Sequence, residues 1–558
     1  MTGSKIGRAI PFLLLLAGSA VLFLGGLGRL PLLGRDESLY AEAAREMFAR
    51  GDWITPRVNG GPFFEKPPLY YWLAWMSYSA FGVSPFAARL PAALMAVVTV
   101  VLTAAAGARV WGARAGLLAG VALATSLQIA LIGRMGIMDV PLTCLTTLAL
   151  FAYARWRTAT GSALIALGGG FGLCVGLAVL LKGMAGLLPV AIAAVHALIF
   201  RRYGPESLPS TRGWGAFARG SSVVIAVALF VAVALPWFYL MGDRHGESFG
   251  STLLLREHLT RMAEPMQGHG GPFFYYAVCI VVSFFPWVMF LPPALASRRA
   301  ETESARALWR SLLIVWFAVV LIPFSLIQTK LPGYVTPLFP AMAMLVGVEL
   351  DRRLRAPGRA PWVAVIAGAV VLAGLTSLLP ALAARLGERV GAAHAASRLV
   401  VPVLVWIAGY ALIALGGACA VAGRVRAGLG AIIGGQLVAV GAVLLGILPV
   451  LSPYLEGGRE SGLAELARQE LPRNQVVLYD TRPEAVAFVL GRPVPAYGRD
   501  QFDRALLHLE EEPVALVAPA KARELWESLP VRRVWQVGDR VLLDVPKISH
   551  SQQEDLNP

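Results

Sequence analysis

The chain has 558 residues, of which 57% are hydrophobic and only 15% are charged, and its mean hydropathy is +0.64. A soluble protein of this length would carry about a quarter charged residues, so the composition excludes an ordinary soluble chain and predicts a polytopic membrane protein. The net charge of +15 would suggest nucleic acid in a soluble protein, but here Lys and Arg in cytoplasmic loops explain it, and no nucleic-acid partner is expected.

The first apolar run, about residues 9–30, follows Lys5 and Arg8 and begins like a signal peptide. It is long enough to span a membrane and lacks a convincing cleavage site, so we expect it to be the first transmembrane helix. The four cysteines all lie in apolar runs and are expected to be small buried residues.

A polar insert, residues 34–86, separates this first span from the next. It opens with Asp36 and Glu37 and carries Glu65-Lys66-Pro67-Pro68 before the chain becomes apolar again. Charged groups next to hydrocarbon are costly unless polar groups meet them there. The insert is therefore predicted to be a site rather than a linker.

A window of about 20 residues gives about thirteen apolar spans along the chain. The run 162–200 is too long for one helix, so we expect two spans that turn back at Lys182. The predicted spans are 9–30, 87–108, 115–132, 140–154, 162–181, 183–200, 220–241, 273–294, 309–327, 334–350, 362–382, 399–420 and 429–452.

Arginines occupy every second loop, from Arg109 and Arg114 to Arg424 and Arg426, so this face is predicted to be cytoplasmic. The outer face then carries the insert, the turn 133–139, Lys182, the loop 242–272 and Lys330. The charged residues on that face are Asp36, Glu37, Glu65, Lys66, Arg134, Asp139, Lys182, Arg256, His258, Arg261 and Lys330. A single cation there is explained by interfacial anchoring, but eleven residues of mixed sign favour a polar cavity.

Residues 1–452 are expected to form the transmembrane domain, with 242–272 as a lid loop, and residues 453–558 a small soluble α/β domain. Strand-like segments at 476–480, 515–519, 534–537 and 541–545 alternate with helical stretches near 481–490 and 521–529. The domain has no glycine-rich phosphate loop, so an accessory or lid role on the outer face is favoured.

An enzyme on the outer face has no ATP, so a group transfer there needs a donor that is already activated, such as a sugar on a polyprenyl phosphate. The leaving phosphate needs cations near the membrane surface, and five residues could supply them: Lys66, Lys182, Arg256, Arg261 and Lys330. Asp36 and Glu37 could orient or deprotonate the acceptor.

The chain resembles the bacterial aminoarabinose transferases of lipid A, within the membrane glycosyltransferases related to protein O-mannosyltransferases. The segments that carry the resemblance run in order up to about residue 340. They are RDESLYAEAAREMFARGDWITPRVNGGPFFEKPPLYYW (35–72), ARLPAAL (88–94), GRMGIMD (133–139), LAVLLKG (177–183), REHLTRM (256–262), GPFFYY (271–276), FFPW (284–287) and FSLIQTKLPGYVTPLFP (324–340).

The resemblance implies a GT-C fold and transfer of 4-amino-4-deoxy-L-arabinose from undecaprenyl phosphate to a lipid A phosphate, at the periplasmic face of the inner membrane. It implies that Asp36 is the catalytic carboxylate and that Lys66 holds the carrier phosphate, helped by Arg256 or Arg261. The glycine-rich loop leaves open which arginine does so. The remaining residues implied in the pocket are Arg35, Tyr40, Glu65, Tyr70, Arg134, Asp139, Lys182, His258, Lys330 and Tyr334.

Two alternatives stay open at this stage. The acceptor could be a protein or glycan hydroxyl, which needs a base more than an ionised phosphate does. The chain could also be a transporter of a lipid-linked sugar, although transporters usually show internal repeats and midplane charges, which are not found here. No cofactor is required; Asp36, Glu65 and His258 could meet around a divalent ion, which stays open as the less favoured alternative because they lack the spacing of a fixed metal motif. The expected partners are the lipid-linked donor, the acceptor and membrane lipids, and the chain is expected to be a monomer.

Overall fold

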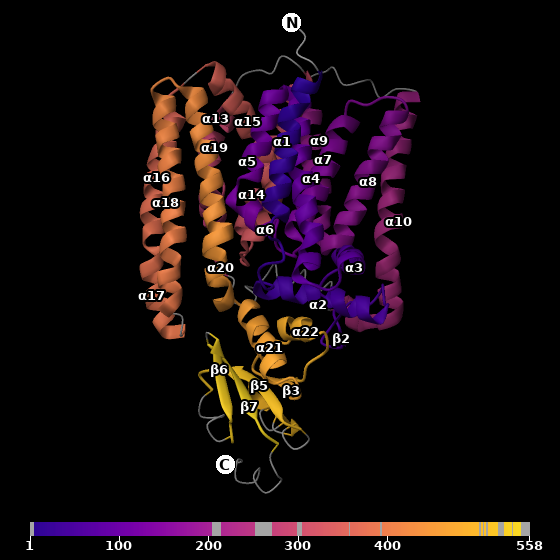
Figure 1. Cartoon of the computed structure of the whole chain (residues 1–558). Helices are drawn as coiled ribbons and strands as arrows, with labels where there is room; N and C mark the ends of the chain where they lie inside the picture. The colour runs from indigo at the N-terminus through magenta and orange to yellow at the C-terminus, as the bar shows by residue number, and fades with distance from the viewer. Residues whose placement is uncertain are drawn as a thin grey trace.

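The helices of this protein form a bundle whose long axes run roughly parallel, with a small β-sheet at one end and the N-terminus at the other (Figure 1). The computed structural model describes residues 5–203, 214–251, 270–297, 304–356, 358–390, 393–501, 504–505, 507–508, 512–522, 529–537 and 539–547.

The bundle begins with α1 (Lys5–Leu24) and continues after the insert with α4 (Pro85–Trp111). Ser84 caps α4 by accepting a hydrogen bond from the Ala87 amide, and Pro85 occupies the first helical position, where its missing N–H costs nothing. The other bundle helices are α5 (Ala113–Ala124), α6 (Leu127–Ile132), α7 (Asp139–Trp156), α8 (Ser162–Lys182), α9 (Leu188–Tyr203), α10 (Trp214–Gly250), α12 (Tyr275–Ser283), α13 (Leu291–Ala296), α14 (Ser304–Leu326), α15 (Phe339–Arg355), α16 (Ala360–Ser377), α17 (Leu379–Val390), α18 (Ala393–Val421), α19 (Val425–Ala442) and α20 (Leu448–Leu451).

Eight helical segments of the described residues are long and apolar enough to cross a membrane, or nine if the bent pair formed by α12 and 287–296 is one span. Several carry large apolar side chains on the outside, such as Val224 and Leu235 on α10 and Val371 on α16. Lipid would cover these side chains. The prediction of a polytopic helical membrane protein is confirmed.

The apolar run 162–200 turns back on itself at Lys182, as the sequence predicts. Lys182 is the last residue of α8, and the 3₁₀ turn η1 (Gly183–Leu187) leads into α9. A Cβ on Gly186 would meet the backbone of Ala178 and Val179, about eight residues earlier, which a continuous helix would hold far apart.

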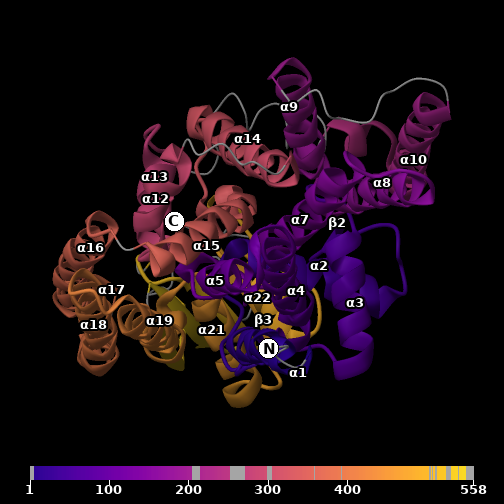
Figure 2. The ribbon, with the colours of Figure 1, turned by 90° about the horizontal axis from the view of Figure 1, so that it is seen from above.

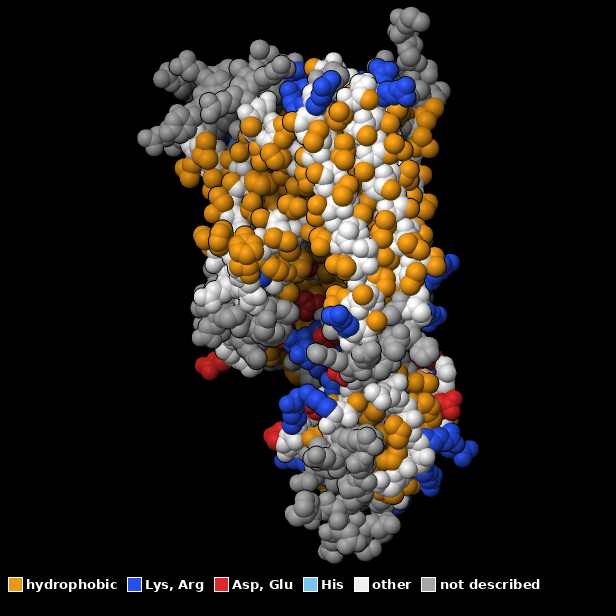
Figure 3. All heavy atoms as spheres, turned by 90° about the vertical axis from the view of Figure 1, so that its left-hand side faces the viewer, with side chains coloured by type: hydrophobic (Ala, Val, Ile, Leu, Met, Phe, Trp, Pro, Cys, Tyr) orange, Lys and Arg blue, Asp and Glu red, His pale blue; other side chains and the backbone are white. Residues whose placement is uncertain are grey.

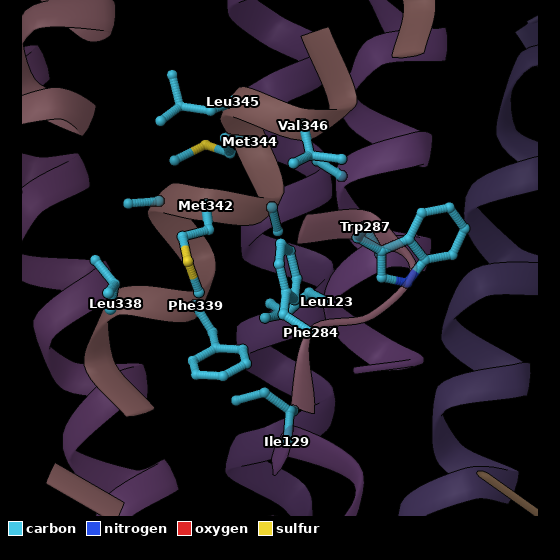
Figure 4. Packing of buried hydrophobic residues seen from close by; sticks show 14 of the residues in the cluster. Leu123, Ile129, Phe284, Trp287, Leu338, Phe339, Met342, Met344, Leu345 and Val346 are labelled. Atoms are coloured by element: carbon cyan, nitrogen blue, oxygen red, sulfur yellow. The ribbon is translucent and has the colours of Figure 1, made fainter. Parts of the chain in front are cut away.

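Side chains from α4, α5, α12, α15 and the 3₁₀ turn η3 (Trp287–Phe290) fill the centre of the bundle (Figure 4). The rings of Phe284 and Phe339 meet edge to face with centroids 5.5 Å apart. The buried Trp287 indole donates to Thr125 Oγ1 at 3.0 Å. Close packing and internal hydrogen bonds, rather than exclusion of water, hold helices together inside a membrane.

Viewed along the bundle, α4, α5, α7 and α15 lie centrally, α16, α18 and α19 lie to one side, and α8 and α10 lie to another (Figure 2). Glycines allow α18 and α19 to approach closely: a Cβ on Gly409 would lie 2.7 Å from the Gly435 carbonyl oxygen. Lys and Arg side chains gather at the end of the bundle that carries the N-terminus, as the loop pattern predicts (Figure 3).

The insert folds as α2 (Gly34–Arg50), a small hairpin of β1 (Arg57–Val58) and β2 (Gly61–Pro62), and α3 (Leu69–Phe81). Helix α2 lies across the ends of the bundle helices (Figure 1). Leu39, Ala43 and Met47, four residues apart, are all buried on one side of it. Gly51 ends α2 with φ 67°, a left-handed conformation that glycine adopts without strain.

The C-terminal part forms a five-stranded sheet in the order β4-β3-β5-β7-β6, in which β3 is parallel to β4 and β5, and β7 is antiparallel to β5 and β6. Helices α21 (Gly458–Glu470) and α22 (Glu484–Leu490) cover one face. The strands are β3 (Gln475–Tyr479), β4 (Ala496–Tyr497), β5 (Val514–Pro519), β6 (Arg533–Val537) and β7 (Arg540–Val545). The sequence did not suggest β4 or α21, and the helix expected at 521–529 lies mostly outside the described residues.

This sheet domain is fastened to the insert by hydrogen bonds between the two. The Gly34 amide donates to the Glu456 carbonyl at 2.7 Å, and Arg45 Nη1 donates to the Gly491 carbonyl at 2.8 Å. Asn59 exchanges two bonds with the Val494 backbone, at 2.9 and 2.7 Å. The sheet therefore lies on the same side of the bundle as α2, opposite the N-terminus (Figure 1).

Candidate functional site

The candidate site lies where α2 crosses the ends of the bundle helices. Four segments contribute to it: the first turn of α2, the start of α7 at Asp139, the end of α8 at Lys182, and the 3₁₀ turn η4 (Pro332–Leu338). Acidic and basic side chains are visible in the recess between the apolar band of the bundle and the sheet domain (Figure 3).

Asp36 presents an open carboxylate at this site. It lies in the first turn of α2 and is exposed, while most of the helix after it is buried. Among the residues that the structure describes, no hydrogen bond or ion pair engages its oxygens. Its carboxylate is therefore accessible to a substrate at the N-terminus of the helix.

Tyr40 lies one helical turn after Asp36 and is buried. Burial raises the pKa of Tyr40 well above its usual value, and the negative charge of Asp36, with smaller contributions from Tyr71, Asp139 and Glu65, raises it further. Tyr40 therefore keeps its proton, and its hydroxyl can donate a hydrogen bond.

Asp139 and Lys182 form an ion pair that joins α7 to α8, with Lys182 Nζ 2.9 Å from Asp139 Oδ1. Both side chains are only slightly exposed. Lys182 Nζ also lies 5.8 Å from the ring centroid of Tyr334 in η4. Gly333 makes this approach possible, because a Cβ there would lie 2.5 Å from Asp139 Oδ1.

The second acidic segment of the insert lies beside the first turn of α2. Arg35 Nη2 is 3.9 Å from Glu65 Oε1, and both side chains are about a quarter exposed. Lys66 Nζ donates to the Glu65 carbonyl oxygen at 3.1 Å, and the residue is only 9% exposed. The site thus holds exposed and half-buried charges of both signs.

Glu37 differs from its predicted role. It is fully buried and accepts hydrogen bonds from the Leu33 amide, the Gly136 amide at 2.6 Å, and two nitrogens of Arg89 at 2.8 Å. Its oxygens are occupied, so it cannot contact a substrate. Glu37 instead joins α2 to α4 and to the turn before Asp139.

Three further predicted residues are also engaged in structural contacts. The buried Tyr70 hydroxyl donates to the Ala88 carbonyl at 2.8 Å. The Arg134 guanidinium donates to the Leu22 and Gly25 carbonyls, which satisfies the end of α1. Lys330 Nζ donates to the Phe324 and Ser325 carbonyls at 2.9 and 2.6 Å, which does the same for α14. In this structure the protein itself engages these polar groups, and their roles in the pocket or at the carrier phosphate stay predictions.

Most of the expected lid 242–272 lies outside the described residues, and this part includes Arg256, His258 and Arg261. Residues 242–250 of that loop instead continue α10, which is kinked at Gly246. Within the described ranges, no group of three or more His, Cys, Asp or Glu side chains could hold a metal ion.

Two residues that organise the site were not singled out from the sequence. Arg89 donates to Glu37 and also to the Leu27, Leu30 and Pro31 carbonyls, so it fixes the chain entering α2. Its position, a charge at the start of an apolar span, was the available signal. Gln128 donates to the Pro332 carbonyl at 2.7 Å and so holds η4; nothing in the sequence marks it.

The geometry suits a substrate that carries negative charge and reacts at the membrane surface. Asp36 is free to orient an acceptor, Tyr40 supplies a neutral donor, and Lys182 supplies a cation held in place by Asp139. Preorganised charges of this kind stabilise charge that develops during a reaction.

Comparison with known proteins agrees with this picture. The family model of dolichyl-phosphate-mannose-protein mannosyltransferases matches residues 65–239. The undecaprenyl phosphate-alpha-4-amino-4-deoxy-L-arabinose arabinosyl transferase of Pectobacterium carotovorum is 31% identical over 381 residues, which are 63% of this chain and 64% of that protein. The protein of the same name from Pectobacterium atrosepticum is 32% identical over 58% of this chain and 56% of its own length. The chain therefore aligns with less than two thirds of the length of these relatives.

The crystal structure of ArnT from Cupriavidus metallidurans bound to undecaprenyl phosphate matches with a TM-score of 0.75 and 23% identity, over 98% of this chain and 99% of that one. The apo state of the same protein matches with a TM-score of 0.75 and 24% identity, over 97% and 98%. The expected resemblance to the aminoarabinose transferases is confirmed, and the fold of this chain is that of ArnT.

Proposed function

We propose that the chain is a polyprenyl-phosphate-dependent glycosyltransferase. It transfers 4-amino-4-deoxy-L-arabinose from undecaprenyl phosphate to a phosphate of lipid A. The observation that carries the proposal is the exposed Asp36 carboxylate beside Tyr40 and the Asp139–Lys182 pair, within a fold that matches ArnT over 98% of the chain.

The proposal places thirteen spans in the bacterial inner membrane, with residues 1–452 as the transmembrane domain. The site and residues 453–558 face the periplasm. Support comes from the arginines at the N-terminal end of the bundle and from α2 and the sheet domain at the other end. The alternation of loops is compatible with a monomer.

The reaction is an inverting single displacement. An oxygen of the acceptor phosphate attacks the anomeric carbon, while the bond from that carbon to the carrier phosphate oxygen breaks and its electron pair leaves with the carrier. The acceptor changes from a monoester to a diester as the carrier does the reverse, so one negative charge moves between them and no proton need be transferred.

This charge transfer defines the roles of the side chains. Lys66, with Arg256 or Arg261, would hold the carrier phosphate and stabilise its growing charge. Asp36 would orient the acceptor, and Tyr40 and Glu65 would shape the pocket. The Asp139–Lys182 pair would set the electrostatic potential at the site.

Mass spectrometry of lipid A tests the proposal in a host that makes undecaprenyl-phosphate aminoarabinose but lacks its own transferase. Expression of the chain should add the aminoarabinose mass, and Asp36→Asn should abolish the addition. Asp500→Asn, an exposed acid on the sheet domain, is the matched control and should retain it. Full transfer by Asp36→Asn would sink the assignment of the site.

A hydroxyl acceptor on a protein or glycan is the second candidate. It is favoured by the match of residues 65–239 to the protein mannosyltransferase model and by the open Asp36, which could take up a hydroxyl proton. Unchanged lipid A together with new glycopeptides in the same cells would establish it. Movement of a lipid-linked sugar across proteoliposomes without any transfer would indicate a transporter instead.

A further inference from the structure

A cavity of about 600 Å³ lies where the sheet domain meets the start of α2. It is lined by the first turn of α2, the loops that follow β3 and β4, the residues after β5, and the turn between β6 and β7. Asp139, Lys182 and Lys66 are not among its lining residues.

The cavity lies at the carboxyl ends of three neighbouring parallel strands. After β3 the chain enters α22 on one face of the sheet, whereas Ala505, which follows β4, packs on the other face. The two loops diverge at this point and leave a crevice between them. In open α/β sheets, this crevice is where ligands bind.

Several arginines line this cavity, and three of their guanidinium groups are only partly hydrogen-bonded by the protein. The Nε atoms of Arg35, Arg459 and Arg540 are buried and have no hydrogen-bond partner among the described residues. Arg540 is held by bonds from Nη1 to the Asp480 carbonyl at 2.6 Å and to Thr481 Oγ1 at 3.2 Å. These Nε atoms present no surface to the cavity, so a ligand there would meet the outer Nη edges of the guanidinium groups, which suit an anion or a hydroxyl-bearing ligand.

The carboxylates of the cavity are already engaged. Asp480 accepts from Arg499 at 2.8 Å, Glu456 from Arg482 at 3.1 Å, and Glu460 from the Gly457 amide at 2.7 Å. Asp539 pairs with Arg459. Burial raises the pKa of Glu484, the remaining acid, which favours its neutral form. Arg540, whose bonds go to uncharged oxygens, and the exposed Lys521 therefore remain as positive surface, whereas Arg35 faces Glu65 and Glu484.

The mixture of polar groups fits a sugar as well as an anion. Tyr497 contributes an aromatic side chain, and its hydroxyl is fixed by His508 Nε2 at 2.6 Å. Carboxylate oxygens and guanidinium groups exchange hydrogen bonds with sugar hydroxyls, and guanidinium forks bind phosphate in two-point geometry.

We propose that this cavity binds a phosphorylated saccharide and thereby holds the part of the acceptor that projects from the membrane. The assignment to the acceptor rests on the proposed function; the binding of a sugar phosphate does not. Arg35 connects this cavity with the candidate site. It lines the cavity, its Nη2 lies 3.9 Å from Glu65 Oε1, and it directly precedes the exposed Asp36 in the chain.

Isothermal titration of the full-length purified chain with glucosamine 1-phosphate tests the proposal. The titration uses a Lys66→Ala background, so that the proposed carrier site does not contribute. Arg540→Met and Lys521→Met should each raise Kd about tenfold, since a charge-assisted hydrogen bond contributes on this order. Lys521 is exposed and has no described partner, so Lys521→Met stays informative even if Arg540→Met fails to fold.

Arg533→Met is the matched control, because Arg533 lies on β6 of the same sheet, pairs with Glu470 at 3.8 Å and is outside the cavity. It should bind as the parent does. No binding by the folded parent, or a parent-like Kd in both cavity variants, would overturn the proposal.

Inorganic phosphate and glucosamine are the comparison ligands. Tighter binding of the sugar phosphate than of either one supports a headgroup site. If inorganic phosphate binds as tightly as the sugar phosphate, the cavity is a site for free phosphate. If glucosamine binds as tightly as the sugar phosphate, the cations do not contribute to binding. Either result overturns the proposal as stated.

Kinetics separates this proposal from the proposed function. With Lys66 intact, Lys521→Met should raise the KM for lipid A several-fold and leave kcat unchanged, whereas a merely structural defect would lower kcat and Tm. If both cavity variants transfer sugar to lipid A and bind the sugar phosphate as tightly as the parent does, only the cavity proposal is defeated. Sugar-phosphate binding without any transfer would defeat the proposed function alone.

Discussion

At the scale of single residues, Asp36 and Glu37 are neighbours of like charge with different environments. Successive helical residues point about 100° apart, so one faces the recess and the other faces the bundle. Asp36 is exposed, whereas Glu37 is fully buried against Arg89. Two acids that the sequence presents as a pair therefore have separate tasks.

This difference predicts opposite responses to the same chemical change. Asp36→Asn should lower kcat for transfer about 100-fold or more, because it removes the charged group that orients the acceptor, and should leave Tm unchanged. Glu37→Gln should lower stability by about 3 kcal/mol or more, because it leaves the Arg89 guanidinium buried without its counter-charge. Thermal unfolding and transfer assays on both variants check this. Equal loss of stability in the two variants would contradict the division of roles.

The Asp139–Lys182 pair predicts non-additive behaviour. Lys182→Met and Asp139→Asn should each reduce kcat/KM, because each leaves a charge of a close pair without its partner. The kcat/KM of the double variant should be no lower than that of the less active single variant. Strictly multiplicative losses in the double-mutant cycle would show that the two residues act independently.

At the scale of elements, the insert and the sheet domain behave as one unit. Asn59 sits in the turn between β1 and β2 with φ 51° and exchanges both of its amide hydrogen bonds with Val494. Asparagine tolerates this left-handed conformation better than most residues do. The turn of the insert thereby fixes the edge of the sheet next to β4.

Asn59→Ala should loosen this attachment by about 1–2 kcal/mol, because it removes two hydrogen bonds and places alanine at a positive φ. Limited proteolysis should then release the sheet domain faster than in the parent. Arg473→Ala, an exposed change on the same domain, is the control. An unchanged proteolysis rate in Asn59→Ala would mean that other contacts hold the domain.

At the scale of the whole molecule, the bundle separates two chemically different ends. Basic side chains gather at the end that carries the N-terminus, and the insert and sheet domain occupy the other end (Figures 1 and 3). The proposed orientation follows from this asymmetry, because Lys and Arg favour the cytoplasmic side.

Cysteine labelling in intact cells checks the orientation. In a variant that lacks the four native cysteines, Arg473→Cys on the sheet domain should react with a membrane-impermeant maleimide after the outer membrane is permeabilised. Arg426→Cys, at the exposed second residue of α19, should react only after lysis. The reverse pattern would invert the proposed topology.

The sequence by itself determined the class of protein, the position of most helices, the turn at Lys182 and the insert as the place to look. These features depend on local composition and on the bias of charge across a membrane, both of which are written along the chain. The motifs of the insert also carried the resemblance that the comparisons confirm.

Only the tertiary structure decided which charges face the recess. Four residues have side chains of the kinds expected at a site, but their polar atoms are hydrogen-bonded to Arg89 or to backbone carbonyls of other segments. They are Glu37, Tyr70, Arg134 and Lys330. The same holds for the cavity at the strand ends, whose lining comes from α2 and from loops more than 400 residues later in the chain. Burial and hydrogen-bond partners arise from contacts between distant segments, so local sequence patterns cannot specify them.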